Sequence, residues 1–186
     1  MTIEEIVAEL QGLAEPKYRD FAASLIPGEE DMLGVRLPLL RKLARRVARQ
    51  EDWESIFYEL GSYSRMEMVM LRGMLPGYAP NATLSERLRA LAAFIPTIRN
   101  WSICDSCCAT YTFAREFRAG VLDFLRPYLG STKEYEARFA VVILLNHYLN
   151  DSAYVAHVAK LLSLVNCRAY YADMAVAWCA CELILR

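Results

Sequence analysis

One short stretch constrains the fold more than any other part of this sequence. From Ala137 to Leu145 the residues are apolar on nearly all sides of a helix, with Arg138 the only charged one. A helix that is apolar all round must be covered by protein on both sides. Either a compact bundle or stacked antiparallel helix pairs would do this, and the second gives a curved solenoid with a concave groove. We favour the stacked pairs and expect these residues in the core: Phe139, Val142, Ile143, Leu161, Leu162 and Leu164.

Helical signals continue along almost the whole chain. Four capping boxes precede apolar-periodic segments, namely Thr2-x-x-Glu5, Ser64-x-x-Glu67, Thr83-x-x-Glu86 and Ser131-x-x-Glu134. No segment combines period-two alternation with hairpin turn residues, so no strand is predicted. The sequence predicts an all-α fold with helices at about 2–13, 16–26, 38–50, 53–60, 64–75, 83–94, 100–110, 113–128, 132–149, 152–164 and 168–185.

Length and composition indicate one globular domain over residues 1–186. A chain of this length can bury a sizeable core without disulfides or metals. Uninterrupted apolar runs such as residues 139–145 are far shorter than the ~18 residues that a membrane helix needs. The N-terminus is acidic and amphipathic, unlike a signal peptide. We therefore expect a cytoplasmic protein that does not engage a membrane, and a monomer.

The charge distribution is more informative than the net charge of −1, which alone argues against a nucleic-acid binder. The segment 36–49 contains six basic residues and no acid: Arg36, Arg41, Lys42, Arg45, Arg46 and Arg49. Such a stripe is either a solvated helix face or a phosphate-binding surface. The acidic run Glu29-Glu30-Asp31 just before it balances part of the charge.

Six cysteines raise the question of a metal site: Cys104, Cys107, Cys108, Cys167, Cys179 and Cys181. The Cys104-x-x-Cys107 spacing resembles that of zinc ligands. These residues, however, lie in helical, apolar contexts rather than on knuckle turns, and Cys104 and Cys107 share the core-directed face of their helix. We predict buried free thiols and no metal.

A possible functional site lies at Asn100-Trp101-Ser102-Ile103-Cys104-Asp105. On a helix, Trp101 and Asp105 are four residues apart and therefore share one face. This places a carboxylate beside a flat ring at the edge of a packed surface, an arrangement that could face a ligand. The alternative is structural, with Trp101 in the core and Asp105 solvated or capping a helix.

Three segments together carry a family resemblance: Gly34-Val35-Arg36-x-Pro38-x-Leu40-Arg41-Lys42-Leu43-Ala44, Phe94-Ile95-Pro96-x-Ile98-x-Asn100-Trp101-x-x-Cys104-Asp105, and Tyr170-Tyr171-x-x-Met174-Ala175-Val176-Ala177-Trp178. In this order they resemble the DNA alkylation repair (AlkD-like) family of alkylpurine DNA glycosylases, which are built from HEAT-like helical repeats. The resemblance extends from about residue 16 to the end of the chain. It implies a right-handed superhelical solenoid, a duplex DNA partner with alkylated bases, and no cofactor.

The resemblance also implies roles for individual residues. Asp105 would be the catalytic carboxylate, Trp101 and Trp178 would flank the lesion nucleotide, and Arg138 would contact the DNA backbone. The residues that would supply further phosphate contacts are Arg36, Arg41 and Arg45. The sequence departs from the family at Asp173, where a lysine is common, and it ends before the further C-terminal helices of other members. Tyr18 and Phe21 are both candidates for the family's N-terminal aromatic residue.

These residue types suit the excision of cationic bases. An N3- or N7-alkylated purine leaves as a neutral molecule, so the reaction needs no strong general acid. A carboxylate such as Asp105 can favour the developing oxocarbenium charge of the sugar and position a water. Two indoles would attract the cation by ~0.5–2 kcal/mol each. The alternatives are a non-catalytic helical-repeat module that binds DNA or protein, and a metal-binding regulator that uses the cysteines.

Overall fold

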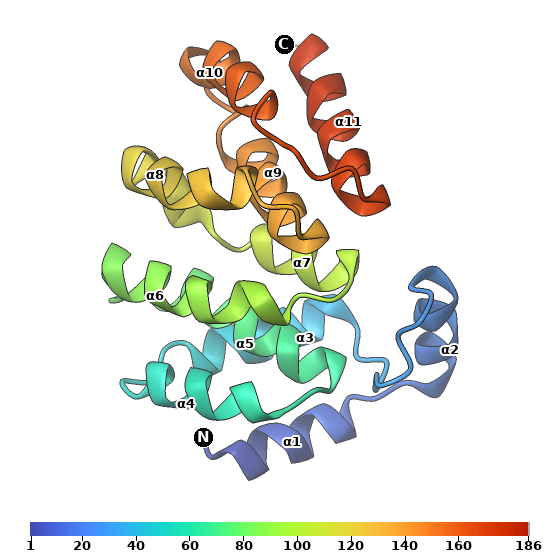
Figure 1. Ribbon diagram of the computed structural model, residues 1–186. Helices are drawn as coiled ribbons and strands as arrows, with labels where there is room; N and C mark the ends of the chain where they lie inside the picture. The colour runs from blue at the N-terminus through green and yellow to red at the C-terminus, as the bar shows by residue number, and fades with distance from the viewer. Residues whose placement is uncertain (186) are drawn as a thin grey trace. The chain divides into compact units, whose positions relative to one another are not determined.

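The computed structural model describes residues 1–185, which form two compact units, Met1–Cys107 and the described residues from Cys108 onward. These residues contain eleven α-helices, three short 3-10 helices and no strand, which confirms the all-α prediction. The helices of the first unit are α1 (Ile3–Gly12), α2 (Pro16–Leu25), α3 (Leu37–Val47), α4 (Trp53–Glu59), α5 (Met66–Tyr78), α6 (Leu84–Phe94) and α7 (Trp101–Cys108), the last of which ends at the boundary. The second unit contains α8 (Arg118–Leu129), α9 (Glu134–His147), α10 (Ser152–Leu162) and α11 (Tyr170–Ile184) (Figure 1).

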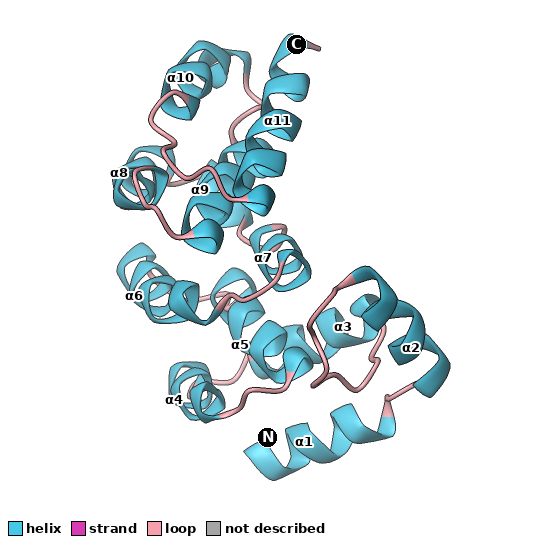
Figure 2. Cartoon of the chain, turned by 45° about the vertical axis from the view of Figure 1, so that its right-hand side comes forward, coloured by secondary structure: helices cyan, strands magenta, loops and turns pink. Residues whose placement is uncertain are grey.

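Helix α5 is the centre of the first unit. Every residue from Met66 to Pro76 is buried, and α3, α4 and α6 pack around this helix (Figure 2). Helix α2 is the opposite case, because none of its residues is buried. It lies at the edge of the unit in Figures 1 and 2 and is followed by an irregular loop that reaches α3. The attachment of this loop therefore contributes to the position of α2.

Helix α9 occupies the corresponding central position in the second unit. Residues 137–145 are all buried, and α8 and α11 both pack against the helix, as its apolar surface predicts. Of the other predicted core residues, Leu161 is buried and Leu162 is half-buried. The prediction for Leu164 was wrong, because this residue lies in the turn after α10 and is 45% exposed.

Two of the four predicted capping boxes are confirmed, those of Thr2 with Glu5 and of Thr83 with Glu86. The other two were wrong, because their side chains make different contacts. The Ser64 hydroxyl donates to Asp31, and the carboxylate of Glu67 binds a loop instead of the start of its own helix. The Ser131 hydroxyl donates to Glu136.

None of the helices in residues 1–185 combines the length and the apolar character that a membrane span requires.

Candidate functional site

Helix α7 presents two distinct faces. Ile103, Cys104 and Cys107 are fully buried on one side. Trp101 and Asp105 are both partly exposed, one turn apart on the opposite side. The structural alternative of a core tryptophan is therefore wrong for Trp101. The helix brings a carboxylate and an indole to one solvent-reachable face, as the spacing predicts.

The start of α7 is held by hydrogen bonds to the last residue of α2 and to Glu29 in the loop that follows α2. The Asn100 carboxamide oxygen accepts a hydrogen bond from the Ile103 amide at 2.9 Å and so caps the helix. Its Nδ2 donates to the Glu29 Oε2 at 2.7 Å, and the Arg99 guanidinium donates to Oε1 of the same carboxylate at 2.8 Å. The Trp101 indole N–H donates to the Leu25 carbonyl at 3.4 Å. Asn100 is therefore the residue that caps the start of α7.

A second carboxylate, from α5, binds the same loop. Glu67, which is 5% exposed, accepts hydrogen bonds from the backbone amides of Leu33, Gly34 and Val35 at 2.8–3.2 Å. Gly34 has a φ of +82°, and a Cβ there would lie 2.6 Å from atoms of Arg19. The Gly34-Val35 part of the first family segment is therefore structural, since it forms the cradle that receives Glu67.

A small hollow of about 90 Å³ lies beside the exposed face of α7. The hollow is lined by Ser102, Ser106 and Tyr18 of α2. The two serines directly follow Trp101 and Asp105 in the sequence. Met66 and Met70 of α5 are also in the wall of the hollow. Phe21, the other candidate for the N-terminal aromatic residue, does not line the hollow and is 59% exposed. Of the two aromatic residues, Tyr18 is therefore the one beside α7, and the guanidinium of Arg36 lies 4.9 Å from the centre of its ring.

The predicted site residues of the second unit lie on α9 and α11. Trp178 is 46% exposed, so its side chain is not part of the core. Arg138 is buried, donates to the Tyr171 carbonyl at 2.7 Å and lies 6.0 Å from the centre of the Tyr171 ring. The exposed Asp173 lies in the first turn of α11, 3.6 Å from a nitrogen of Arg168. Because Trp101 and Asp105 belong to the other unit, their convergence with Trp178 stays a prediction.

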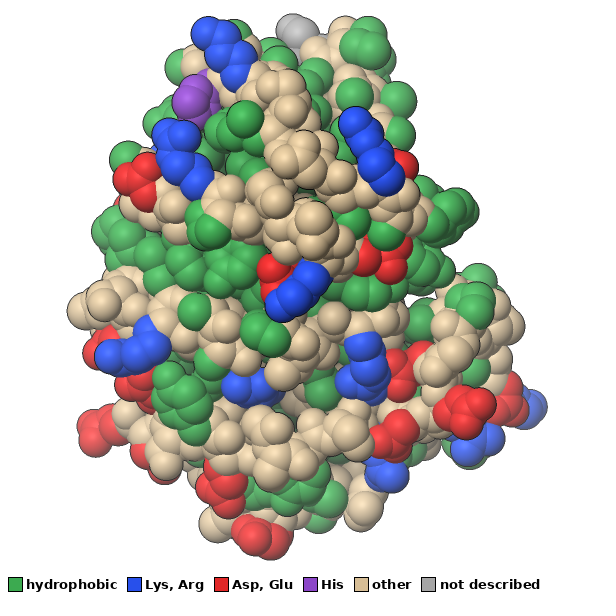
Figure 3. Space-filling view, in the orientation of Figure 1, with side chains coloured by type: hydrophobic (Ala, Val, Ile, Leu, Met, Phe, Trp, Pro, Cys, Tyr) green, Lys and Arg blue, Asp and Glu red, His purple; other side chains and the backbone are tan. Residues whose placement is uncertain are grey.

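The predicted basic residues differ in how they are held. Arg36 makes a two-point ion pair with Glu15 at 2.8 and 2.9 Å, which lowers the pKa of Glu15 and raises that of Arg36. Arg45 is exposed and lies 4.6 Å from the centre of the Tyr78 ring. The Nε of Arg41 is buried without a hydrogen-bond partner among the described residues. On the face drawn in Figure 3, basic side chains are scattered among acidic ones over each unit.

Five of the six cysteines are buried free thiols, and Cys181 is exposed. Burial, followed by the neighbouring Cys104, raises the pKa of Cys107 well above its ordinary value, while Arg41 opposes this shift. Within residues 1–185, no three Cys, His, Asp or Glu side chains are grouped as metal ligands.

Comparison with known proteins decides the family. The model of a family described as DNA alkylation repair enzyme matches residues 6–177, which is most of the chain. The protein belongs to this DNA alkylation repair enzyme family. Trp101, Asp105 and Arg138 lie inside the matched range of the family, and Trp178 follows its last residue directly. No curated protein and no solved structure matches the chain.

Sequence reasoning missed Glu29 and Glu67, which hold the loop beside α7. The acidic run that contains Glu29 was interpreted only as charge balance for the basic segment. The signal that could have found Glu67 is its position at the start of the segment 66–76, in which Arg72 is the only other charged residue. A carboxylate buried in such a segment needs hydrogen-bond donors.

Proposed function

We propose that this member of the DNA alkylation repair enzyme family is a DNA glycosylase that excises positively charged N3- and N7-alkylated purines from duplex DNA. The observation that carries the proposal is the partly exposed face of α7, on which Asp105 and Trp101 lie one turn apart. Membership of a repair family supports the DNA partner. The proposed reaction is hydrolysis of the N-glycosidic bond, without a cofactor.

In the proposed mechanism, Asp105 is the catalytic carboxylate. The alkylated base already carries a positive charge and departs as a neutral molecule, so the carboxylate need not protonate it. Asp105 stabilises the oxocarbenium character of the sugar and orients the water that attacks C1′. Trp101 and Trp178 flank the lesion nucleotide and favour a cationic base by ~0.5–2 kcal/mol each. A neutral purine lacks this attraction, which gives selectivity without a base-reading pocket.

The DNA-binding part of the proposal assigns phosphate contacts to Arg138, Arg36, Arg41 and Arg45. Arg45 is the best placed of the three residues on or next to α3, because it is exposed and the structure gives it an aromatic neighbour rather than an acidic one. Arg36 must exchange its ion pair with Glu15 for a phosphate. We expect both contacts to weaken as salt concentration rises.

The architecture that we propose for this function is one domain, a right-handed solenoid of HEAT-like helix pairs with a concave groove. Packing between consecutive helices supports it in each unit, with α5 against α6 in the first and α8 against α9 and α10 against α11 in the second. A groove of this kind would let the enzyme act on a nucleotide without a deep pocket.

The test is single-turnover release of 7-methylguanine from a duplex that contains one 7-methylguanine. Asp105→Asn keeps the size of the side chain and removes its charge, and we expect it to slow release by about 10²- to 10³-fold while DNA affinity is retained. Asp123→Asn, at an acid that is 77% exposed on α8, is the matched control and should keep the wild-type rate. Equal rates for wild type and Asp105→Asn would contradict the assignment.

The second candidate is a non-catalytic helical-repeat module that binds DNA or protein. The ion pairs of Arg36 with Glu15 and of Arg46 with Glu9 favour it, because they neutralise part of the basic segment, as does the acid at Asp173. Such a module would bind methylated and unmethylated duplexes equally, and Trp101→Ala would leave this binding unchanged.

A further inference from the structure

We propose that Glu29 is a positioning residue for the site on α7, an inference that rests on the proposed glycosylase function. Glu29, Arg99 and Asn100 form a cluster that we call the Glu29 clamp. The side chain of Glu29 is 5% exposed, and its carboxylate accepts a hydrogen bond from Arg99 on one oxygen and from Asn100 on the other. The clamp joins the loop after α2 to the residues that immediately precede Trp101.

The clamp fixes which way the Asn100 carboxamide faces. Its Nδ2 can donate to Glu29 only when its Oδ1 points to the Ile103 amide, and the distances of 2.7 and 2.9 Å satisfy both bonds. Because Asn100 and Arg99 each donate to a different oxygen of Glu29, both oxygens of its carboxylate act as acceptors. A glutamine has the same size but offers one acceptor and one donor, so one of its groups would face another donor.

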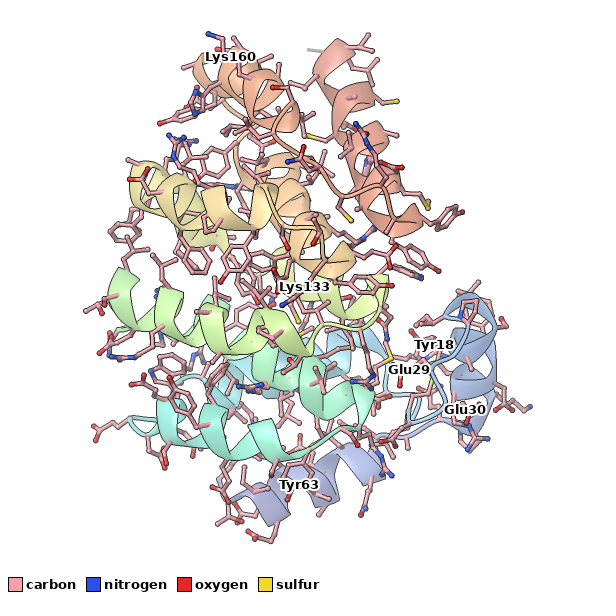
Figure 4. All side chains as sticks on the ribbon, in the orientation of Figure 1. Tyr18, Glu29, Glu30, Tyr63, Lys133 and Lys160 are labelled. Carbon is pink, nitrogen blue, oxygen red and sulfur yellow. The ribbon has the colours of Figure 1, made fainter. Side chains whose placement is uncertain are left out.

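The last residue of α2, which leads into this loop, contacts the first residue of α7. The carbonyl of Leu25, at the end of α2, accepts the indole N–H of Trp101. Two consecutive residues, 100 and 101, are thus hydrogen-bonded to the segment 25–29. Asp105 follows Trp101 one turn later on the same face of α7. Figure 4 shows Glu29 between α2 and the rest of the first unit, with Glu30 farther out. The hydrogen bonds of the Glu29 carboxylate are made to Arg99 and Asn100 and not to Trp101 or Asp105. Any effect of Glu29 on the site therefore passes through Asn100.

This arrangement explains why a buried carboxylate lies in an irregular loop. Burying an ionised group is unfavourable unless it is paired and hydrogen-bonded, and Arg99 and Asn100 supply both. A misplacement of about 1 Å can reduce a catalysed rate about 10²-fold, so a rigid start of α7 has a direct kinetic consequence. The clamp therefore sets the geometry of the indole and the carboxylate before DNA is bound.

The test exchanges donors and acceptors across the clamp. Glu29→Gln places an amide N–H₂ against a donor, and Asn100→Asp places a second carboxylate against Glu29. We expect each single variant to slow single-turnover release of 7-methylguanine by about 10- to 100-fold, with little change in DNA affinity. In the double variant, the introduced glutamine can donate to the introduced aspartate while still accepting from Arg99, and that aspartate can still cap the helix. We expect this variant to regain at least about tenfold over the slower single variant.

Two further measurements separate positioning from loss of folding and from failure of the proposed function. In ¹⁵N-labelled full-length protein, the Trp101 indole and Ile103 amide signals should shift in Glu29→Gln and return toward wild type in the double variant. Glu30→Gln, the same change at the exposed neighbouring residue, should leave signals and rate unchanged. If wild type releases no alkylated base, the proposed function fails and the signals still test the clamp. A wild-type rate in Glu29→Gln, or a double variant no better than the slower single one, would overturn the role of Glu29.

Discussion

The attachment of the loop after α2 gives a stability prediction that can be worked out from the structure. Glu67→Ala removes a buried carboxylate that accepts hydrogen bonds from the amides of Leu33, Gly34 and Val35. A hydrogen bond to a charged group contributes ~1.5–3 kcal/mol, and each donor left dry incurs a desolvation penalty of similar size. Water can reach the partly buried Leu33 amide, so the expected loss in the free energy of unfolding is about 3–5 kcal/mol.

A loss of this size would be easy to detect. Domains are typically stable by ~5–15 kcal/mol, and for a chain of this length each kcal/mol corresponds to about 2–4 °C in Tm. Urea denaturation followed by circular dichroism gives the free energy directly. Glu67→Gln keeps one acceptor oxygen and should lose roughly half as much as Glu67→Ala. Glu30→Ala, at an exposed acid in the loop, should stay within about 0.5 kcal/mol of wild type. If Glu67→Ala behaves like Glu30→Ala, the carboxylate does not hold the loop and the reasoning is refuted.

Three other predictions concern buried groups and the basic face. Burial lowers the pKa of His147 below its ordinary 6.5, so the imidazole of the unfolded chain takes up a proton at a higher pH than that of the folded protein. The stability of the folded protein should therefore fall as the pH drops below 6.5. His147→Gln should flatten this part of a plot of urea midpoint against pH, whereas His157→Gln, at an exposed residue, should not. A disulfide exchange reagent should modify Cys181 fast and the remaining thiols only on unfolding, so Cys181→Ser should abolish the fast phase. In a plot of the logarithm of the DNA-binding constant against the logarithm of the salt concentration, Arg45→Ala should reduce the slope by about 0.9. Arg46→Ala, which breaks an ion pair with Glu9, should change the slope less. Equal slopes for the two variants would argue against a phosphate contact at Arg45.

The sequence was sufficient for features that depend on local periodicity. The number of α-helices, the all-round burial of residues 137–145 and the shared face of Trp101 and Asp105 all follow from helical spacing and apolar pattern. Leu164 was misplaced because an apolar residue just beyond a helix end looks the same in sequence as one inside it. Periodicity also gave no information on where the two units lie in space.

Polar side chains with distant partners could not be placed in this way. Ser64 and Glu67 have the spacing of a capping box, yet each binds the loop that precedes α3. Glu29 and Asn100 are separated by 71 positions, and nothing in the neighbouring residues of either indicates the other. Local spacing reports which groups could interact within one helix, whereas the partner of a buried carboxylate is decided by tertiary packing.

The most direct test of the central claim is to identify what leaves the DNA. Purified wild-type protein is incubated with duplex DNA that carries 7-methylguanine, and the small molecules and the DNA are then analysed separately by mass spectrometry. Excision predicts free, intact 7-methylguanine in solution and an equal amount of abasic sites in the duplex. Methylated base that stays in the DNA, or guanine restored in place without an abasic site, would contradict the glycosylase account.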